Sequence, residues 1–254
     1  MQVQSEHKEY TDYRLTSRVL PSKTTSWHRE FYFTTKRALD FVVASLCLLL
    51  LSPLFGVIVL FVIIDTPGSA IFQQIRLTAR RHKNAHGEEQ WEVIPFTCYK
   101  FRSMYCGTSS ALHEEFMRAL IKQDAARMME LQGGDCSERK LVHDPRITRV
   151  GSFIRRTSLD ELPQLWNVLR GDLSLVGPRP PLPYEVDMYA PWHWMRMRCQ
   201  PGLTGWWQVT KRATADFDDM VQLDLWYTDH QSLLTDLMIL ARTPIAVLSQ
   251  KGAC

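Results

Sequence analysis

An adjacent pair of acids is the feature of this sequence best suited to chemistry. Asp160 and Glu161 directly precede an apolar stretch that predicts a helix over residues 162–169. The positive end of a helix attracts phosphate and favours the ionised form of a carboxylate. A carboxylate held beside a phosphate can attack phosphorus and form an acyl phosphate. The pair is therefore a candidate site for phosphate chemistry.

Basic residues are frequent on both sides of this pair. The segment 144–179 contains six arginines, namely Arg146, Arg149, Arg155, Arg156, Arg170 and Arg179. A carboxylate and a diphosphate repel each other unless cations lie between them. Guanidinium groups bind phosphate oxygens in a bidentate manner, and magnesium can bridge Glu161 to a diphosphate. The segment predicts a site for anionic diphosphate chemistry.

Helix capping is an alternative explanation of the same acids. Ser158 and Glu161 have the spacing of a capping box, in which Ser158 is the N-cap and Glu161 reaches back to it. Pro163 complicates this role, because proline prefers the first helical position and would leave both acids ahead of the helix. The residues alone leave both interpretations open.

Other motifs give weaker signals. Asp216 and Asp218 form a D-x-D motif of the type that holds magnesium in some glycosyltransferases, but a solvated helix start explains it more simply. The acids after His113 lack the second histidine of a metalloprotease helix, and neither a P-loop nor a dinucleotide-binding fingerprint is present. The six cysteines form no C-x-x-C pair and no zinc spacing, which indicates reduced thiols.

Residues 41–64 form an apolar run of 24 residues without a charge. As a straight helix the run would be about 36 Å long, enough to cross a hydrocarbon core of roughly 30 Å. It starts too far from the N-terminus for a signal peptide and is too long for the apolar region of one. It also exceeds what a domain of this size usually buries. We therefore predict a membrane helix.

The Ser52-Pro53 pair interrupts this run near its middle. Pro53 cannot donate a backbone hydrogen bond, so we expect a kink there, with the freed carbonyl bonded by the Ser52 hydroxyl or by neighbouring protein. Either a kinked spanning helix or a re-entrant hairpin fits. Cationic residues mark the cytoplasmic side, and they occur on both flanks, at Lys36 and Arg37 and again from Arg76. This placement favours the re-entrant form.

The remaining sequence is mixed. Residues 69–75 and 91–101 are rich in aromatic and β-branched residues and predict a β-hairpin. Residues 109–131 have the apolar spacing of a helix that ends at Gly133 and Gly134. We expect an α+β fold that is mostly helical.

Two later segments have amphipathic character. Residues 217–248 show helical periodicity with an expected break at Pro244. Residues 182–197 and 233–248 are predicted to lie on a bilayer surface as interfacial helices.

The charge balance argues against nucleic acid as a partner. The 254 residues carry a net charge of +3, and no run of lysine and arginine is dense enough for a DNA-binding arm. A mild positive charge permits contact with anionic lipid or phosphate.

Four stretches, in this order, resemble the bacterial sugar transferase family, the monotopic phosphoglycosyl transferases. They are KRALDFVVASLCLLLLSPLFGVIVLFVIIDTPGSAIFQQIRL, YKFRSM, DPRITRVGSFIRRTSLDELPQLWNVLRGDLSLVGPRP and PGLTGWWQV. The resemblance covers roughly residues 34–250. Several long motifs in order are far more specific than any single one.

This resemblance implies a reaction and its residues. Asp160 would attack the β-phosphorus of a UDP-sugar, expel UMP and carry the phosphosugar covalently. A polyprenyl phosphate, such as undecaprenyl phosphate, would then accept the phosphosugar. Glu161 would bind Mg²⁺, and Arg102, Arg155 and Arg179 would contact phosphates.

The resemblance also implies where the protein works. It predicts a monotopic protein with a polar N-terminal segment over residues 1–33, a re-entrant membrane helix over 34–68 that breaks at Ser52 and Pro53, and a cytosolic catalytic domain over 69–254. The catalytic domain would face the cytoplasm at the bacterial inner membrane. The expected role is to initiate synthesis of a capsule, lipopolysaccharide or exopolysaccharide. A homodimer is left open.

The sequence departs from the family pattern in places, and rival functions remain. Gln200 stands where arginine or lysine commonly precedes the P-G-[IL]-T-G-W motif, which puts one cationic contact in doubt. One rival is a membrane-anchored, metal-dependent glycosyltransferase that uses Asp216 and Asp218 and releases UDP. The other is a non-catalytic scaffold in which the acid pair is only a cap. The sequence does not identify the sugar.

Overall fold

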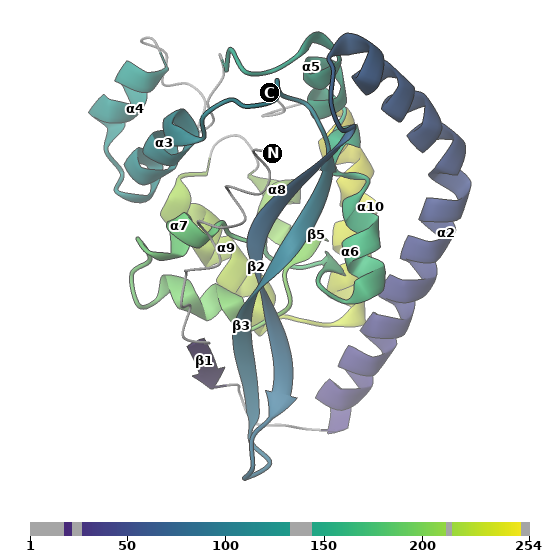
Figure 1. Ribbon diagram of the computed structural model, residues 1–254. Helices are drawn as coiled ribbons and strands as arrows, with labels where there is room; N and C mark the ends of the chain where they lie inside the picture. The colour runs from purple at the N-terminus through teal and green to yellow at the C-terminus, as the bar shows by residue number, and fades with distance from the viewer. Residues whose placement is uncertain (1–17, 22–26, 133–143, 212–214, 250–254) are drawn as a thin grey trace.

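The computed structural model describes residues 18–21, 27–132, 144–211 and 215–249 (Figure 1). In chain order the elements are β1 (Arg18–Pro21), α2 (Trp27–Asp65), β2 (Ile71–Lys83), β3 (Glu89–Phe101), α3 (Ala111–Ile121), α4 (Ala125–Leu131), α5 (Arg149–Arg156), the 3₁₀ turn η1 (Leu159–Glu161), α6 (Gln164–Arg170), β4 (Ser174–Val176), α7 (Pro183–Val186), the 3₁₀ turn η2 (His193–Met197), β5 (Gly202–Thr204), α8 (Trp206–Thr210), α9 (Phe217–Asp229) and α10 (Leu233–Leu248). The mixed, mostly helical fold agrees with the prediction.

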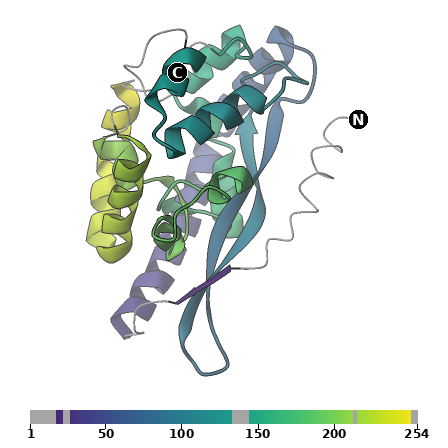
Figure 2. The same ribbon diagram turned by 90° about the vertical axis from the view of Figure 1, so that its left-hand side faces the viewer.

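The predicted β-hairpin is present and is longer than expected. Strands β2 and β3 pair antiparallel from Ile71 opposite Phe101 to Lys83 opposite Glu89, and the tip of the hairpin projects beyond the rest of the molecule (Figures 1 and 2). The short strand β1 pairs with the other edge of β3. It lies in the segment that we expected to be only polar, and its four residues are too few to show an alternating pattern.

A second, two-stranded sheet lies further along the chain. Strands β4 and β5 pair in parallel, with Ser174 opposite Gly202 and Val176 opposite Thr204. The backbones approach so closely here that a Cβ atom on Gly202 would lie 2.1 Å from the Gly177 nitrogen. Only glycine fits this crossing, which fixes the loop that carries Arg179 against β5.

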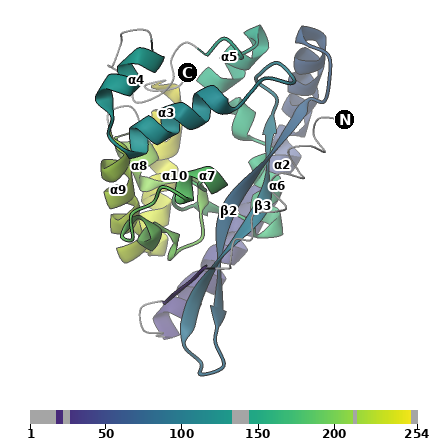
Figure 3. The same cartoon turned by 60° about the vertical axis from the view of Figure 1, so that its left-hand side comes forward.

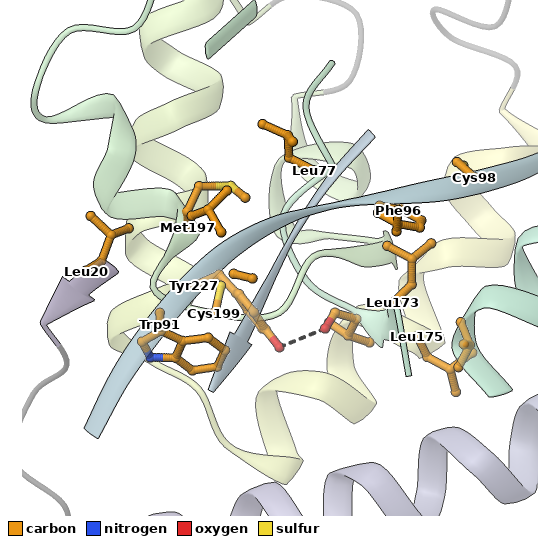
Figure 4. Packing of buried hydrophobic residues seen from close by; sticks show 14 of the residues in the cluster. Leu20, Leu77, Trp91, Phe96, Cys98, Leu173, Leu175, Met197, Cys199 and Tyr227 are labelled. Atoms are coloured by element: carbon orange, nitrogen blue, oxygen red, sulfur yellow. Dashed lines mark hydrogen bonds between the residues drawn. The ribbon is translucent and has the colours of Figure 1, made fainter. Parts of the chain in front are cut away.

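The main core joins the hairpin to the later helices. Leu77 and Trp91 from the two hairpin strands pack with Leu173, Met197 and Tyr227 from elements further along the chain (Figure 4). Figure 3 shows α2 and α6 on one side of the hairpin and α7 on the other, and both α6 and α7 contact it. This packing holds the hairpin against the connection between α5 and α6.

The apolar run forms part of one long helix, α2, which begins at Trp27 and continues through Pro53 to Asp65. It is the one described helix that is long and apolar enough to cross a membrane. The Ser52 hydroxyl donates to the Leu49 carbonyl at 2.8 Å, and that carbonyl is the group that the missing N–H of Pro53 leaves free. The expected hydrogen bond is therefore confirmed. The helix bends toward its C-terminal end (Figure 1) but is not interrupted by a break.

Both ends of α2 are attached to the same globular body. Near its start, Lys36 donates to Asp236 of α10 at 2.7 Å in a buried ion pair. At its end, the Asp65 carboxylate accepts from the Val150 backbone N–H of α5 at 3.1 Å. Between these anchors the helix exposes large apolar side chains, such as Leu50 at 67%. An exposed apolar face of this kind is typical of a surface that contacts a membrane or another protein.

The expected helix over residues 109–131 is two helices. Helix α3 ends at Ile121 and α4 begins at Ala125, because Gln123 takes a left-handed conformation with φ of 56° and Asp124 caps the next helix. The predicted stop at Gly133 and Gly134 lies outside the described residues.

The expected break at Pro244 is also wrong, since Pro244 lies inside α10. The chain breaks earlier, between Asp229 and Leu233, where the Ser232 side chain accepts from the Thr235 N–H and starts a new helix.

Only one of the two predicted interfacial segments has an exposed apolar face. Helix α10 exposes Leu234 and Leu248 at 78% and 79%, in agreement with the prediction for residues 233–248. Residues 182–197 contain only the short α7 and η2, and most of their apolar side chains are buried, with Trp192 exposed and Met195 half-buried. That prediction is wrong because the core, rather than a bilayer, covers this segment.

Candidate active site

The acid pair lies on the short turn η1 that joins α5 to α6. Helix α6 begins after Pro163, so Asp160 and Glu161 stand ahead of it, and the Ser158 side chain forms no capping hydrogen bond. The capping-box interpretation is therefore wrong. Ser158 itself is left-handed, with φ of 57°, a conformation that costs a non-glycine residue about 1–3 kcal/mol. The turn is held in this shape by its surroundings.

The membrane helix forms part of those surroundings. Leu159 and Leu162, on either side of the acid pair, pack in a cluster with Leu54, Ile58 and Val62 of α2. Asp160 itself is only 9% exposed. The turn that carries the acids is thus held by the same apolar cluster as the C-terminal half of α2.

A lysine from the hairpin balances the charge of Glu161. Lys100 Nζ donates to Glu161 Oε1 at 2.8 Å. Burial acts to raise the pKa of Glu161, but Lys100 and Arg179 outweigh it and lower the pKa to about 2. Glu161 is therefore ionised across the physiological range.

The pKa of Asp160 is shifted in the opposite direction. Burial raises the pKa of Asp160 above its ordinary value, against the opposing effect of Lys100, and the neighbouring Glu161 charge raises it further. Arg155 and Arg179 lie close enough to lower it in part. A carboxylate with a raised pKa is more basic, and hence a better nucleophile once it is ionised.

A cavity opens beside these acids. It encloses about 230 Å³, including its mouth, and its polar lining consists of Arg76, Lys100, Glu161, Gln164, Arg179 and Gln208. Three of the polar residues are cations, which suits phosphate oxygens.

The structure brings together four of the predicted site residues. Asp160 and Glu161 share the turn, Arg155 lies nearby on α5, and Arg179 lines the cavity from the loop after β4. No hydrogen bond or ion pair engages the Arg179 guanidinium within the described part of the chain. It is thus available to a ligand.

Arg102 is placed differently. Its guanidinium donates to the backbone carbonyls of Val62, Thr66 and Pro67 at 3.1, 2.6 and 2.5 Å, and its Nη1 also lies 3.0 Å from Cys106 Sγ. These carbonyls belong to the last turn of α2 and the residues just after it, where the helix leaves carbonyls without backbone donors. Of the three, only the Val62 carbonyl also accepts from a backbone N–H within the described ranges, that of Thr66 at 3.3 Å. A phosphate contact by Arg102 remains a prediction.

The sequence interpretation missed the roles of Lys100, Arg76, Gln164 and Gln208. Lys100 and Arg76 stand inside the quoted stretches YKFRSM and QQIR, but a strand pattern does not reveal which side chain meets a distant turn. The buried Arg76 donates to the Pro180 carbonyl at 2.5 Å, next to Arg179. The two glutamines follow Glu161 and Gly205 by three residues each, and only the tertiary fold makes them neighbours.

The donor set of the site fits magnesium that is shared with a substrate. In the described ranges no three acidic, histidine or cysteine side chains gather as a ready-made metal site. Magnesium, however, is usually held by one or two carboxylates together with substrate phosphates. The ionised Glu161, with Asp160 next to it, supplies such a donor set.

The D-x-D motif has a structural role. Asp216 is the N-cap of α9 and accepts from the Asp219 N–H at 2.8 Å. Asp218 bonds His193 and Gln123 at 3.1 and 2.7 Å, and so links α9 to η2 and to the end of α3. The helix-start explanation of the motif is confirmed.

Comparisons with known proteins agree on one family. The sequence model of the family described as "Bacterial sugar transferase" matches residues 31–250. The "Undecaprenyl-phosphate galactose phosphotransferase" of Salmonella typhimurium is 38% identical over 86% of this chain and 41% of its own length. The "Exopolysaccharide production protein ExoY" of Rhizobium meliloti is 38% identical over 86% of this chain and 87% of its own length.

A third relative is named for a different sugar. The "UDP-N-acetylgalactosamine-undecaprenyl-phosphate N-acetylgalactosaminephosphotransferase" of Aeromonas hydrophila is 32% identical over 87% of this chain and 45% of its own length. This chain therefore spans less than half the length of several of its relatives, and nearly all of a shorter one.

Proposed function

Since this chain belongs to the bacterial sugar transferase family, we propose that it transfers a sugar phosphate from a UDP-sugar to undecaprenyl phosphate, with Asp160 as the covalent nucleophile. The relatives named above support the substrate class, because two of them are named as undecaprenyl-phosphate phosphotransferases for galactose and N-acetylgalactosamine. The product would begin a surface polysaccharide.

One observation carries the proposal. The charges of Lys100, Arg155 and Arg179 act on Asp160, and the leucines on either side of the acid pair pack in the same apolar cluster as α2. The same carboxylate is thus within reach of the cations that a diphosphate needs and of the bilayer in which a polyprenyl phosphate resides. A helix cap or a scaffold requires neither condition.

In the first displacement, an Asp160 carboxylate oxygen forms a bond to the β-phosphorus of the UDP-sugar. The bond between that phosphorus and the oxygen that bridges to the α-phosphate breaks, and UMP leaves with the bonding electrons. Arg179 and Lys100 stabilise the charge that accumulates on the phosphate oxygens. Glu161, ionised at neutral pH, would hold Mg²⁺, and the ion would supply further neutralisation of the diphosphate charge.

In the second displacement, a phosphate oxygen of undecaprenyl phosphate attacks the same phosphorus. The acyl-phosphate bond breaks, Asp160 is regenerated as a carboxylate, and the lipid leaves as a diphosphate-linked sugar. Burial of Asp160 and its neighbours limits access of water, which would otherwise hydrolyse the intermediate.

The anchoring of α2 supports a monotopic, re-entrant placement. Both ends of the helix bind the same globular body through Asp236 and Val150, so a crossing of the bilayer would separate groups that are in contact. We place the catalytic body at the cytoplasmic face of the inner membrane, with the bent apolar middle of α2 and the exposed face of α10 in contact with lipid.

The nucleotide that is released tests the proposal. The purified chain in lipid nanodiscs, given a UDP-sugar, magnesium and undecaprenyl phosphate, should release UMP. The Asp160→Asn variant should lose this release by at least about 1,000-fold, because an amide is a poor nucleophile. The Asp218→Asn variant serves as the matched control and should retain it.

Two results would contradict the mechanism. Undiminished UMP release by Asp160→Asn would remove the assigned nucleophile. Release of UDP, lost in the Asp218→Asn variant, would instead favour the metal-dependent glycosyltransferase that the D-x-D motif raised.

A further inference from the structure

The short strand β4 ends three residues before Arg179 and has little sheet around it. It consists of three residues and, within the described ranges, pairs with β5 in a sheet of only two strands. An isolated pair of strands is marginally stable, so β4 needs further contacts to keep a fixed position. The placement of the chain at Arg179 therefore depends on the other groups that bond β4.

Two buried side chains from outside the sheet bond the backbone of β4. The Asp40 carboxylate of α2 accepts from the Leu175 N–H at 3.0 Å. The Tyr227 hydroxyl of α9 donates to the Val176 carbonyl at 3.2 Å. Asp40 is 4% exposed and Tyr227 is 1% exposed, so water does not compete for either bond. These two bonds fix β4 to α2 and to α9.

The Tyr227 hydroxyl also belongs to the group that anchors α2. It lies 2.7 Å from an Asp236 carboxylate oxygen and accepts from Lys36 at 3.3 Å. A hydroxyl has one proton, so the oxygens of Asp236 and Val176 share it. Lys36 and Asp40 lie about one helical turn apart on α2. The membrane helix is therefore bonded to β4 directly through Asp40 and indirectly through Lys36 and Tyr227.

The position of the Arg179 guanidinium depends on the backbone that carries it. This guanidinium lines the cavity, and no hydrogen bond or ion pair within the described part of the chain holds it there. On one side of Arg179, the Pro180 carbonyl accepts from Arg76 at 2.5 Å. On the other side, the Gly177 N–H donates to the Thr204 carbonyl at 2.9 Å, directly after β4. A shift of β4 would therefore move Arg179.

We propose that Asp40 and Tyr227 are positioning residues that hold β4 so that the Arg179 guanidinium meets the substrate phosphates, an inference that rests on the proposed function. Because Asp40 belongs to α2, its bond also sets the position of Arg179 relative to the membrane helix. The lipid phosphate reacts at the same site in the second displacement, so this relation matters for both steps. Displacement of a reacting group by about 1 Å can slow a reaction about 100-fold.

A matched pair of tyrosine variants isolates the bond to β4. Tyr227→Phe and Tyr32→Phe each remove one buried hydroxyl that bonds Asp236, but only the Tyr227 hydroxyl also reaches the Val176 carbonyl. UMP release is measured in nanodiscs with whichever of UDP-galactose and UDP-N-acetylgalactosamine the unmodified chain uses faster. Tyr227→Phe should lower kcat/KM about 3- to 10-fold, and Tyr32→Phe should leave it unchanged.

Substitution of Asp40 should have a larger effect. Asp40→Ala removes the acceptor of the Leu175 N–H and should lower kcat/KM about 10- to 100-fold. Asp40→Asn keeps an oxygen that can accept this bond, and it should retain most of the activity. Thermal unfolding measures how much of each variant is folded, and the rates are expressed per folded molecule.

A second substitution at Arg179 separates positioning from a general loss of structure. If Asp40 acts through the Arg179 guanidinium, Asp40→Ala should not lower kcat/KM further in an Arg179→Met background, because no guanidinium is left to misplace. A purely structural role would lower the rate by the same factor in both backgrounds. Radiolabelled UDP-sugar makes the residual rate of the double variant measurable.

Three results would overturn the inference. They are unchanged activity in both Asp40→Ala and Tyr227→Phe, equal losses in Tyr227→Phe and Tyr32→Phe, and a loss in Asp40→Ala that is the same with and without the Arg179 guanidinium. If Asp40→Ala does not fold, Tyr227→Phe takes its place in combination with Arg179→Met. Failure of the proposed function is a different outcome, in which the unmodified chain releases no UMP.

Discussion

Two arginines that the family resemblance assigns to phosphate occupy opposite kinds of environment. Arg102 lies at the end of α2, where its guanidinium donates to three backbone carbonyls. Arg179 lies at the cavity, where no group in the described part of the chain bonds its guanidinium. Both terminal nitrogens of the Arg102 guanidinium are bonded by the fold, whereas the Arg179 guanidinium is left available to a ligand.

The comparison separates arginines that stabilise the fold from arginines that are available for catalysis. Carbonyls at a helix end need donors, and a buried guanidinium supplies several at once. Arg37 performs the same task at the end of α6, where it donates to the Val168 and Leu169 carbonyls at 2.6 Å each. Arg179, whose guanidinium is not used by the described part of the chain, is therefore the arginine to examine for catalysis.

The largest effect on activity is expected from substitution of Arg179, whose guanidinium is available to a ligand. Arg179→Met should lower kcat/KM for UMP release about 100- to 1,000-fold, the cost of removing one charged donor from a developing anion. Its melting temperature should stay close to that of the unmodified chain. Activity assays and thermal unfolding together check this expectation. Near-normal activity would show that Arg179 is not part of the phosphate site.

Substitution of Arg102 should have the opposite effect, a loss of stability with little loss of activity. Arg102→Met leaves the carbonyls of Thr66 and Pro67 without their guanidinium donor and the Val62 carbonyl with only the Thr66 N–H, which should destabilise the fold by about 1–3 kcal/mol. Chemical denaturation monitored by tryptophan fluorescence measures this loss. The activity per folded molecule should fall only a few-fold.

A matched variant separates these two effects from a general loss of charge. Arg80→Met removes an exposed arginine whose partner Asp172 also pairs with Arg170. It should change stability by less than about 1 kcal/mol and leave activity unchanged. A large loss of activity with unchanged stability in Arg102→Met would place that residue in the phosphate site after all.

The smallest expected effect is a shift in the pH profile. Asp160 must be ionised to attack, and burial raises its pKa, so UMP release should fall on acidification at a pH above the ordinary 3.8 of an aspartate. Lys100 lowers the pKa of both acids, so Lys100→Met should raise them and move the acid limb to higher pH. Profiles of kcat/KM for the two proteins, measured with one substrate, reveal the shift. If the acid limb of the kcat/KM profile lies at the same pH in both proteins, the limb does not report the ionisation of Asp160.

Local patterns in the sequence were sufficient to predict several structural features. The membrane helix, the hydrogen bond from Ser52 to the carbonyl freed by Pro53, and the apolar face of α10 follow from composition and spacing, which act over one or two turns. The hairpin follows from residue types, although its length does not. Failures occurred where a short-range signal competed with a stronger one. The left-handed Gln123 split a predicted helix, and the cap at Ser232 ended another before Pro244.

The sequence by itself determined the acid pair at 160 and 161, the excess of arginine around it and the apolar segment, because these are properties of residue type and order. Tertiary structure alone decided which cations face the acids. It assigned Lys100 to Glu161, bonded Arg102 to the end of α2 and brought Arg76 and Arg179 to the cavity beside Glu161. The physical reason is that an ion pair or a cavity depends on the distance between segments far apart in the chain, and packing of the core sets that distance.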